Sequence, residues 1–209
     1  MTDPAPAFFV QLNLPETDVA RKAYAFAQQA TPAFILNHGI RSYVFARAHA
    51  ARRGLRPRTD YDDELVFLSC ILHGIGLGEQ GNGDQRFEVD GADTAAAFLR
   101  RHGVEERRID IVWDAIALHT SPGIANRWAT EVALTRAGFL IDVIGAGRED
   151  LPAGLAEELH AVLPRADLAY ALSDAVRAQA TAKPQTPYRH LRSAGRGVCA
   201  GQASSSAPG

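Results

Sequence analysis

The hydrophobic residues of this chain recur every three or four positions over several long segments, which is the repeat of an amphipathic helix. Leu65, Leu68 and Leu72, for example, share one face of a helix that the acidic residues 62–64 would begin. No segment shows the period of two that marks a half-buried strand, and no stretch of sequence repeats along the chain. The pattern therefore predicts an all-α fold.

Capping residues, glycines and prolines divide this pattern into separate helices. We expect helices near residues 17–30, 31–53, 62–73, 90–102, 105–118, 131–144, 152–162 and 166–180. The glycine-rich stretch 78–83 predicts a loop with neither helix nor strand. The chain should then form one helical domain over residues 17–182, preceded by an arm over residues 1–16 that docks apolar side chains of residues 8–10, and followed by a flexible tail over residues 183–209.

Composition and charge narrow the expected partners. The 209 residues are 46% hydrophobic, which suits a single packed core. With 22 Lys and Arg against 24 Asp and Glu, the formal net charge of -2 offers no strong field for nucleic acid or for an anionic membrane, and no apolar stretch approaches the roughly 20 residues that cross a bilayer. Cys70 and Cys199 lie in contexts too different for a structural disulfide, which fits a reducing compartment, so we expect a cytoplasmic protein. We expect a small molecule as its substrate, and its oligomeric state stays open.

Three residues in apolar helical surroundings point to a metal site. Asp142 lies in the apolar run 138–144, where a buried carboxylate is costly unless it is paired or bound to a cation. His38 and His73 lie in similar surroundings on two other predicted helices, and helical bundles build metal sites from such inward-facing side chains. The alternative is that Asp142 lies on an exposed stripe and that each histidine is a hydrogen-bonded core residue.

His119 is the candidate catalytic residue. It ends a predicted helix and shares a face with Ile109, Val112 and Ile116, so its ring should point inward, where it can act as a base or contact a substrate. The alternative is an imidazole that merely interacts favourably with the helix dipole. The other histidines lack such surroundings and are expected on the surface; they are His49, His102, His160 and His190.

Taken in order, these segments resemble a known family. Residues 37–38, 71–76, 115–121 and 142–145 are similar to the motifs of the HD superfamily, and residues 87–91 and 119–121 are closest to its cyanamide-hydratase-like branch. The resemblance extends over roughly residues 17–180. It implies a single compact helical bundle of the HD-domain type.

The resemblance also implies a metal-dependent activity. Matched by position, His38, His73 and Asp142 correspond to ligands of a divalent metal, zinc or iron, which activates water for attack on a small polarised substrate such as a nitrile. The Asp that follows the second histidine in the family is replaced here by Gly74, which offers no ligand. Metal occupancy and activity therefore depend on whether two histidines and one carboxylate suffice.

Three further points stay open from the sequence. Glu79 and Asp84 follow closely and are either substitute ligands or solvated loop charges. A phosphohydrolase acting on a phosphate ester is an alternative function, and it would use Arg41 and Arg86, the only basic residues expected near the site. A catalytically silent helical domain that binds a small molecule or a partner is the other alternative, and Gly74 favours it.

Overall fold

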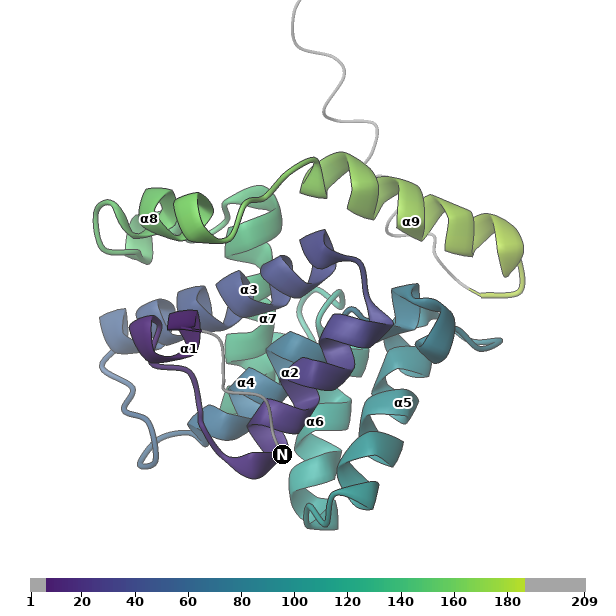
Figure 1. Ribbon diagram of the computed structural model, residues 1–209, viewed down its shortest axis with the longest axis horizontal. Coiled ribbons are helices and arrows are strands. Elements are labelled where there is room, and N and C mark those ends of the chain that lie inside the picture. The colour runs from purple at the N-terminus through teal and green to yellow at the C-terminus, as the bar shows by residue number, and fades with distance from the viewer. Residues whose placement is uncertain (1–6, 187–209) are drawn as a thin grey trace, which may run out of the picture.

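The computed structural model describes residues 7–186, which form helices and no strand within that range (Figure 1). The predicted all-α fold is thereby confirmed. The α-helices are α1 (Ala7–Gln11), α2 (Asp18–Ala30), α3 (Ala33–Arg52), α4 (Asp63–Leu72), α5 (Phe87–Arg101), α6 (Glu106–Leu118), α7 (Thr130–Ile144), α8 (Leu155–Val162) and α9 (Leu168–Ala182). Short 3-10 helices are η1 (Ile75–Leu77), η2 (Glu79–Gly81), η3 (Ala125–Arg127) and η4 (Arg148–Asp150).

The predicted helix caps are largely found where the sequence places them. The Thr17 hydroxyl accepts from the backbone of α2, and the Asp62 carboxylate accepts from two backbone N–H groups of α4. α3 ends before Gly54, which has a φ of +74°, and α7 ends at Gly145, which has a φ of +73°. Glycine adopts this left-handed conformation without steric penalty, so both helices stop at the expected residue.

Two predicted boundaries were wrong. α5 begins at Phe87 rather than at Asp90, because the Asp90 carboxylate accepts hydrogen bonds from the backbone of Gly83 and Gln85 and so holds the preceding loop instead of capping its own helix. The stretch 78–83, expected to lack helix, contains the single 3-10 turn η2. The start of α5 follows from hydrogen bonds between Asp90 and the preceding loop, which the spacing of apolar residues does not reveal.

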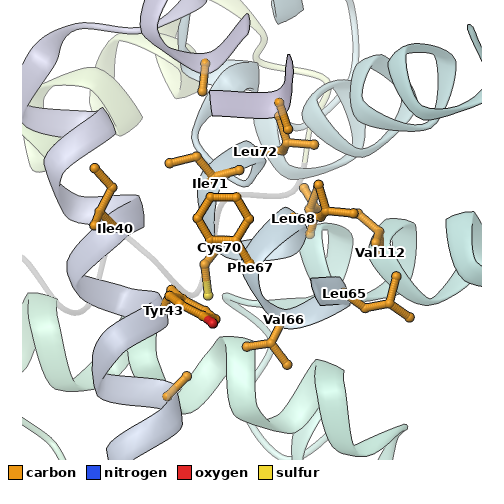
Figure 2. Close-up of a cluster of buried hydrophobic side chains, with 14 of the residues drawn as sticks. Ile40, Tyr43, Leu65, Val66, Phe67, Leu68, Cys70, Ile71, Leu72 and Val112 are labelled. Atoms are coloured by element: carbon orange, nitrogen blue, oxygen red, sulfur yellow. The ribbon is translucent and has the colours of Figure 1, made fainter. Parts of the chain in front are cut away.

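The hydrophobic core is centred on α4, whose residues from Leu65 to Leu72 are all buried (Figure 2). α3, α6 and α7 pack around α4, α5 runs beside α6, and α8 and α9 lie along one side of the bundle next to α3 (Figure 1). Three of the four predicted site residues lie on or directly after these central helices α3, α4 and α7.

Two glycines allow the central helices to approach one another closely. A Cβ atom at Gly138 of α7 would lie 2.0 Å from the backbone oxygen of Ser42 on α3, and one at Gly39 of α3 would lie 2.7 Å from the backbone oxygen of Cys70 on α4. Only a residue without a side chain fits such backbone contacts. The close approach brings the side chains of α3, α4 and α7 into one cluster.

The N-terminal arm docks as predicted, through Phe9. Its ring lies 5.0 Å from that of Tyr24 and 6.3 Å from that of Phe67, centroid to centroid, and Leu14 is also buried. Val10 is instead exposed, because its neighbours form the short helix α1 and turn it outward. The side chain of Phe8 lies outside the described residues.

The first residues of the predicted flexible tail belong to the folded body. Lys183 is only 6% exposed, and its ammonium group lies 2.7 Å from the Asp90 carboxylate and donates to the backbone oxygen of Gln85. The Gln179 amide also donates to Asn82. Residues 1–6 and 187–209, with Cys199 and His190, lie outside the described residues. Within residues 7–186, no helix has both the length and the apolar character needed to span a bilayer.

Candidate functional site

The three predicted metal ligands and the predicted catalytic histidine lie together in the core. His38 comes from α3, His73 and His119 directly follow α4 and α6, and Asp142 comes from α7. The His73 ring lies between the other two, with its centroid 4.9 Å from that of His38 and 4.9 Å from that of His119. All four residues are at most 3% exposed. Asp142 therefore does not lie on an exposed stripe of its helix, which was the alternative interpretation of the sequence.

Phe139 covers the row of three histidines. Its ring centroid lies 5.6 Å from that of His38, 5.9 Å from that of His73 and 4.8 Å from that of His119. The sequence analysis did not select Phe139, although it precedes Asp142 by three residues and so shares its helix face. Its position keeps water away from the imidazoles on that side.

The backbone fixes the orientation of two of the histidines. His73 Nδ1 lies 2.7 Å from the Cys70 carbonyl, and His119 Nδ1 lies 2.6 Å from the Ile116 carbonyl. Because a carbonyl oxygen only accepts, each Nδ1 must donate its proton, which leaves Nε2 with a lone pair. Both residues follow a helix and bond to one of its last carbonyls, groups that otherwise lack a partner within the helix.

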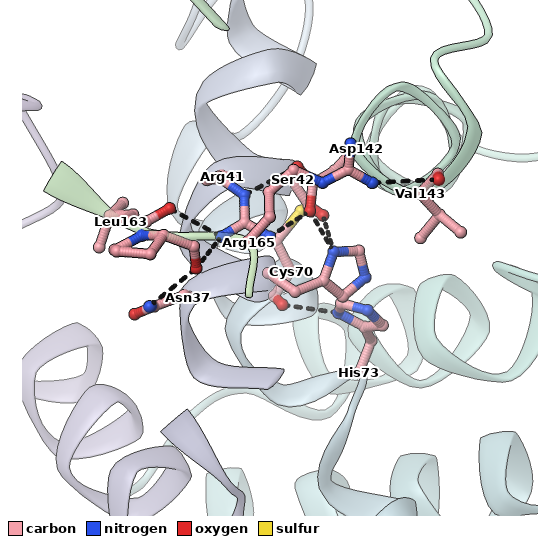
Figure 3. A network of polar contacts seen from close by, with 11 residues as sticks. Asn37, Arg41, Ser42, Cys70, His73, Asp142, Val143, Leu163 and Arg165 are labelled. Atoms are coloured by element: carbon pink, nitrogen blue, oxygen red, sulfur yellow. Dashed lines mark hydrogen bonds and ion pairs between the residues drawn. The ribbon is translucent and has the colours of Figure 1, made fainter. Parts of the chain in front are cut away.

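The third histidine is held by Asp142. His38 Nδ1 lies 2.6 Å from Oδ2 of Asp142, and Arg41 binds both oxygens of the same carboxylate through Nε at 2.8 Å and Nη2 at 2.7 Å (Figure 3). Arg41 Nη1 also donates to the backbone oxygens of Leu163 and Pro164. Arg41, expected as a phosphate ligand, is thus fully engaged within the protein.

Burial and these partners set the charge of each group. Burial by itself would raise the pKa of Asp142, but the hydrogen bonds from His38 and Arg41 outweigh it and lower that pKa to about 2. Burial lowers the pKa of His119 to about 4 and lowers that of His73 well below its ordinary value. Near neutral pH, Asp142 is therefore ionised, and His73 and His119 are neutral.

Gly74, at the position where the HD motif has an aspartate, has Ile35 directly beside it. Its φ of -87° and ψ of -4° suit any residue, but a Cβ atom there would lie 2.3 Å from Cγ2 of Ile35. Glu79 and Asp84 are exposed and do not replace the missing carboxylate. As the side chains stand, no three His, Cys, Asp or Glu residues within 7–186 are arranged to hold a metal ion.

A second buried polar cluster lies beside His119. Glu88 is fully buried and accepts a 2.5 Å hydrogen bond from the Thr120 hydroxyl and a 2.7 Å bond from Nη2 of Arg86. Burial favours a raised pKa for Glu88, but the hydrogen bond from Arg86 and the nearby His119 lower it. Arg86, expected as the other phosphate ligand, is paired with Glu88. Glu88 was given no role from the sequence, although a carboxylate two residues after an arginine at a helix start is a visible signal.

Arg136 of α7 is a further residue that the sequence analysis missed as part of the site. It is buried, and its Nη1 donates to the backbone oxygen of His119 at 2.8 Å. The prediction that Arg41 and Arg86 are the only basic residues near the site was therefore wrong. A single arginine in an apolar helix carries no local signal that separates a buried position from an exposed one.

The remaining histidines lie away from this cluster. His102 is exposed, as predicted. His49 and His160 are half-buried rather than on the surface, because η4 brings Asp150 to 3.0 Å from His49 Nδ1 and His160 packs against Phe45.

Comparison with known proteins adds no family assignment. Neither the family models nor the curated protein sequences contain a match to this chain.

Proposed function

We propose that the chain is a metal-dependent hydratase or hydrolase that activates water for attack on a small polarised substrate such as a nitrile. The observation that carries this proposal is the row of three histidines from three helices, buried side by side with ring centroids 4.9 Å apart. Each Nδ1 faces an acceptor, namely the Asp142 carboxylate or a backbone carbonyl. Histidines that ligate metals are commonly held in this way, with the other ring nitrogen left to bind.

The three rings as they stand do not form a metal-binding group, so metal binding would require a change in their orientation. Their donor chemistry supports His38, His73 and His119 as the residues that would then hold the metal. His38 Nε2 is buried without a hydrogen-bond partner among residues 7–186, which is costly unless a ligand binds it. Like His73, His119 donates its Nδ1 proton to the backbone carbonyl three residues earlier. Its ring centroid also lies 4.9 Å from that of His73, the same distance as that between His73 and His38, so we assign His119 the same role. A bound zinc or iron would supply a Lewis acid at this position.

Asp142 then acts through His38 rather than as a ligand. Both of its oxygens are bound by Arg41 and one also by His38, so direct ligation would require breaking a buried ion pair. A carboxylate behind a ligating histidine orients the ring and raises its basicity. This assignment differs from the one that the HD resemblance implies, which makes Asp142 a ligand.

Metal content tests the proposal. Protein purified without chelator and then incubated with zinc or iron should retain metal after desalting, whereas His38→Ala and His73→Ala should retain much less because each removes a donor. His102→Ala, which changes an exposed histidine, is the control. A substrate panel of nitriles and phosphate esters then distinguishes the two kinds of activity.

His119→Ala separates two roles for that residue. Loss of metal supports its assignment as a ligand, and retained metal with lost turnover supports the catalytic role expected from the sequence. If the wild-type protein retains no zinc or iron, the silent ligand-binding domain replaces this proposal. The methyl group of Ile35, which occupies the space beside Gly74, is the observation that favours that second candidate.

A further inference from the structure

Each buried charge in the described part of the protein has a partner of opposite sign, with one exception. The paired charges are Arg41 with Asp142, Lys183 with Asp90, and Arg86 with Glu88, each at 2.7 Å. The exception is Arg136, which is 8% exposed. Because an isolated buried charge is costly, this arginine needs an explanation.

The contacts of Arg136 are few. Nη1 donates to the His119 backbone oxygen, whereas the buried Nε has no partner among the described residues. No Asp or Glu in residues 7–186 forms an ion pair with it. Burial lowers the pKa of Arg136, but a guanidinium remains charged in proteins. Among the described residues, this positive charge beside His119 thus has no counter-ion.

Other polar groups lie beside His119 next to this guanidinium. Arg86 approaches the adjacent Thr120, with Nη2 3.3 Å from the hydroxyl oxygen, and it also forms an ion pair with Glu88. The segment 119–120 is therefore flanked by two guanidinium groups and one carboxylate.

We propose that Arg136 binds an oxyanion, the carboxylate or phosphate group of a small molecule, beside His119. Such a group would accept hydrogen bonds from the guanidinium, which matches planar oxyanions with two parallel donors, and would supply the missing negative charge. The anion site itself requires no metal. Only the further step, that this anion is part of the substrate, depends on the proposed function.

Thermal unfolding with and without anions tests the site. The protein is first treated with EDTA, because phosphate also binds metals. Any shift in melting temperature with phosphate then reports on the anion site, whether or not the protein also binds a metal. Phosphate, sulfate and acetate are compared with chloride at equal ionic strength, and a larger shift with phosphate than with acetate identifies the preferred group. At ten times the dissociation constant we expect the melting temperature to rise by about 3–6 °C.

Arg136→Gln removes the charge but keeps an N–H donor for the His119 carbonyl. This variant should lose the anion-dependent shift, whereas Arg100→Gln, which changes an exposed arginine paired with Glu106, should keep it. The proposal is overturned if the wild-type protein shows no shift beyond that of chloride, or if Arg136→Gln shows the same shift as the wild type.

Crystallography provides a second test that needs no variant. In wild-type crystals soaked with selenate, an anomalous peak within hydrogen-bond distance of Arg136 is expected. Absence of a peak there would contradict the site even if Arg136→Gln fails to fold.

Discussion

Asp142 illustrates how a single buried residue depends on its partners. It accepts hydrogen bonds from Nε and Nη2 of Arg41 and from His38, all in a part of the core that water does not reach. Breaking a buried ion pair from one side leaves the other charge uncompensated, and this is more harmful than replacing both partners by apolar residues. The Arg41–Asp142 pair is therefore a requirement for the fold as well as for the position of His38.

The first prediction at this scale concerns Arg41. Arg41→Met should lower the free energy of unfolding by about 3–5 kcal/mol, because the Asp142 carboxylate then keeps only His38. Urea unfolding followed by circular dichroism measures the change. Arg100→Met, at an exposed ion pair, should leave the free energy of unfolding nearly unchanged. Equal effects of the two substitutions would show that Arg41 has no special role.

The second residue-scale prediction concerns Gly74. Its backbone conformation accepts an aspartate, but Ile35 occupies the space, so Gly74→Asp should be combined with Ile35→Ala. Relative to Ile35→Ala alone, the double variant should bind zinc at least about tenfold more tightly, because a further carboxylate joins the imidazole donors. Zinc titration of metal-free protein measures this. A folded double variant with unchanged affinity would mean that position 74 does not face the metal.

At the scale of elements, the contact between α3 and α7 decides the geometry of the site. Gly138 lets the two backbones meet, and the contact places Asp142 opposite His38. Gly138→Ala should lower the free energy of unfolding by about 2 kcal/mol, since overpacking exceeds the gain from the better helix former. Gly103→Ala, where a Cβ meets nothing within 4 Å, should cost only about 1 kcal/mol from its positive φ. If Gly138→Ala is the milder change, the helices can separate freely.

Sequence patterns predicted the elements better than the contacts between them. Helix starts at Thr17 and Asp62 follow from local capping chemistry, and the apolar surroundings of His38, His73 and Asp142 predicted their burial. What the sequence could not provide was the partner of each polar group. Arg41 binds Asp142, a residue about a hundred positions away, and the local sequence does not show whether its partner is such a residue or a bound ligand.

For the whole molecule, the buried neutral histidines make stability depend on pH. In the metal-free protein, the pKa of His119 is about 4, against an ordinary 6.5 that the unfolded chain retains. The unfolded state therefore binds more protons between these values, so stability is complete above about pH 6.5 and is lost as the pH falls. We expect a loss of about 2 kcal/mol between pH 6.5 and pH 5 from His119 alone.

Urea unfolding in EDTA over this pH range measures the effect. His119→Gln should reduce the slope, because one titrating group is gone, although His73 still contributes in the same direction. A wild-type stability that does not change between pH 6.5 and pH 5 would contradict burial of neutral histidines.

The ion pair of Lys183 with Asp90 has a consequence for the order of folding. Asp90 leaves the ribosome 93 residues before its counter-ion, so this ion pair can form only after the end of α9 has been synthesised. Contacts between such distant residues close late, because the entropy of closing a long loop is lost before the contact forms. During synthesis, the segment that leads into Arg86 and Glu88 therefore gains its contacts with Lys183 only at a late stage, and a chain released before residue 183 would leave the Asp90 carboxylate without this counter-ion.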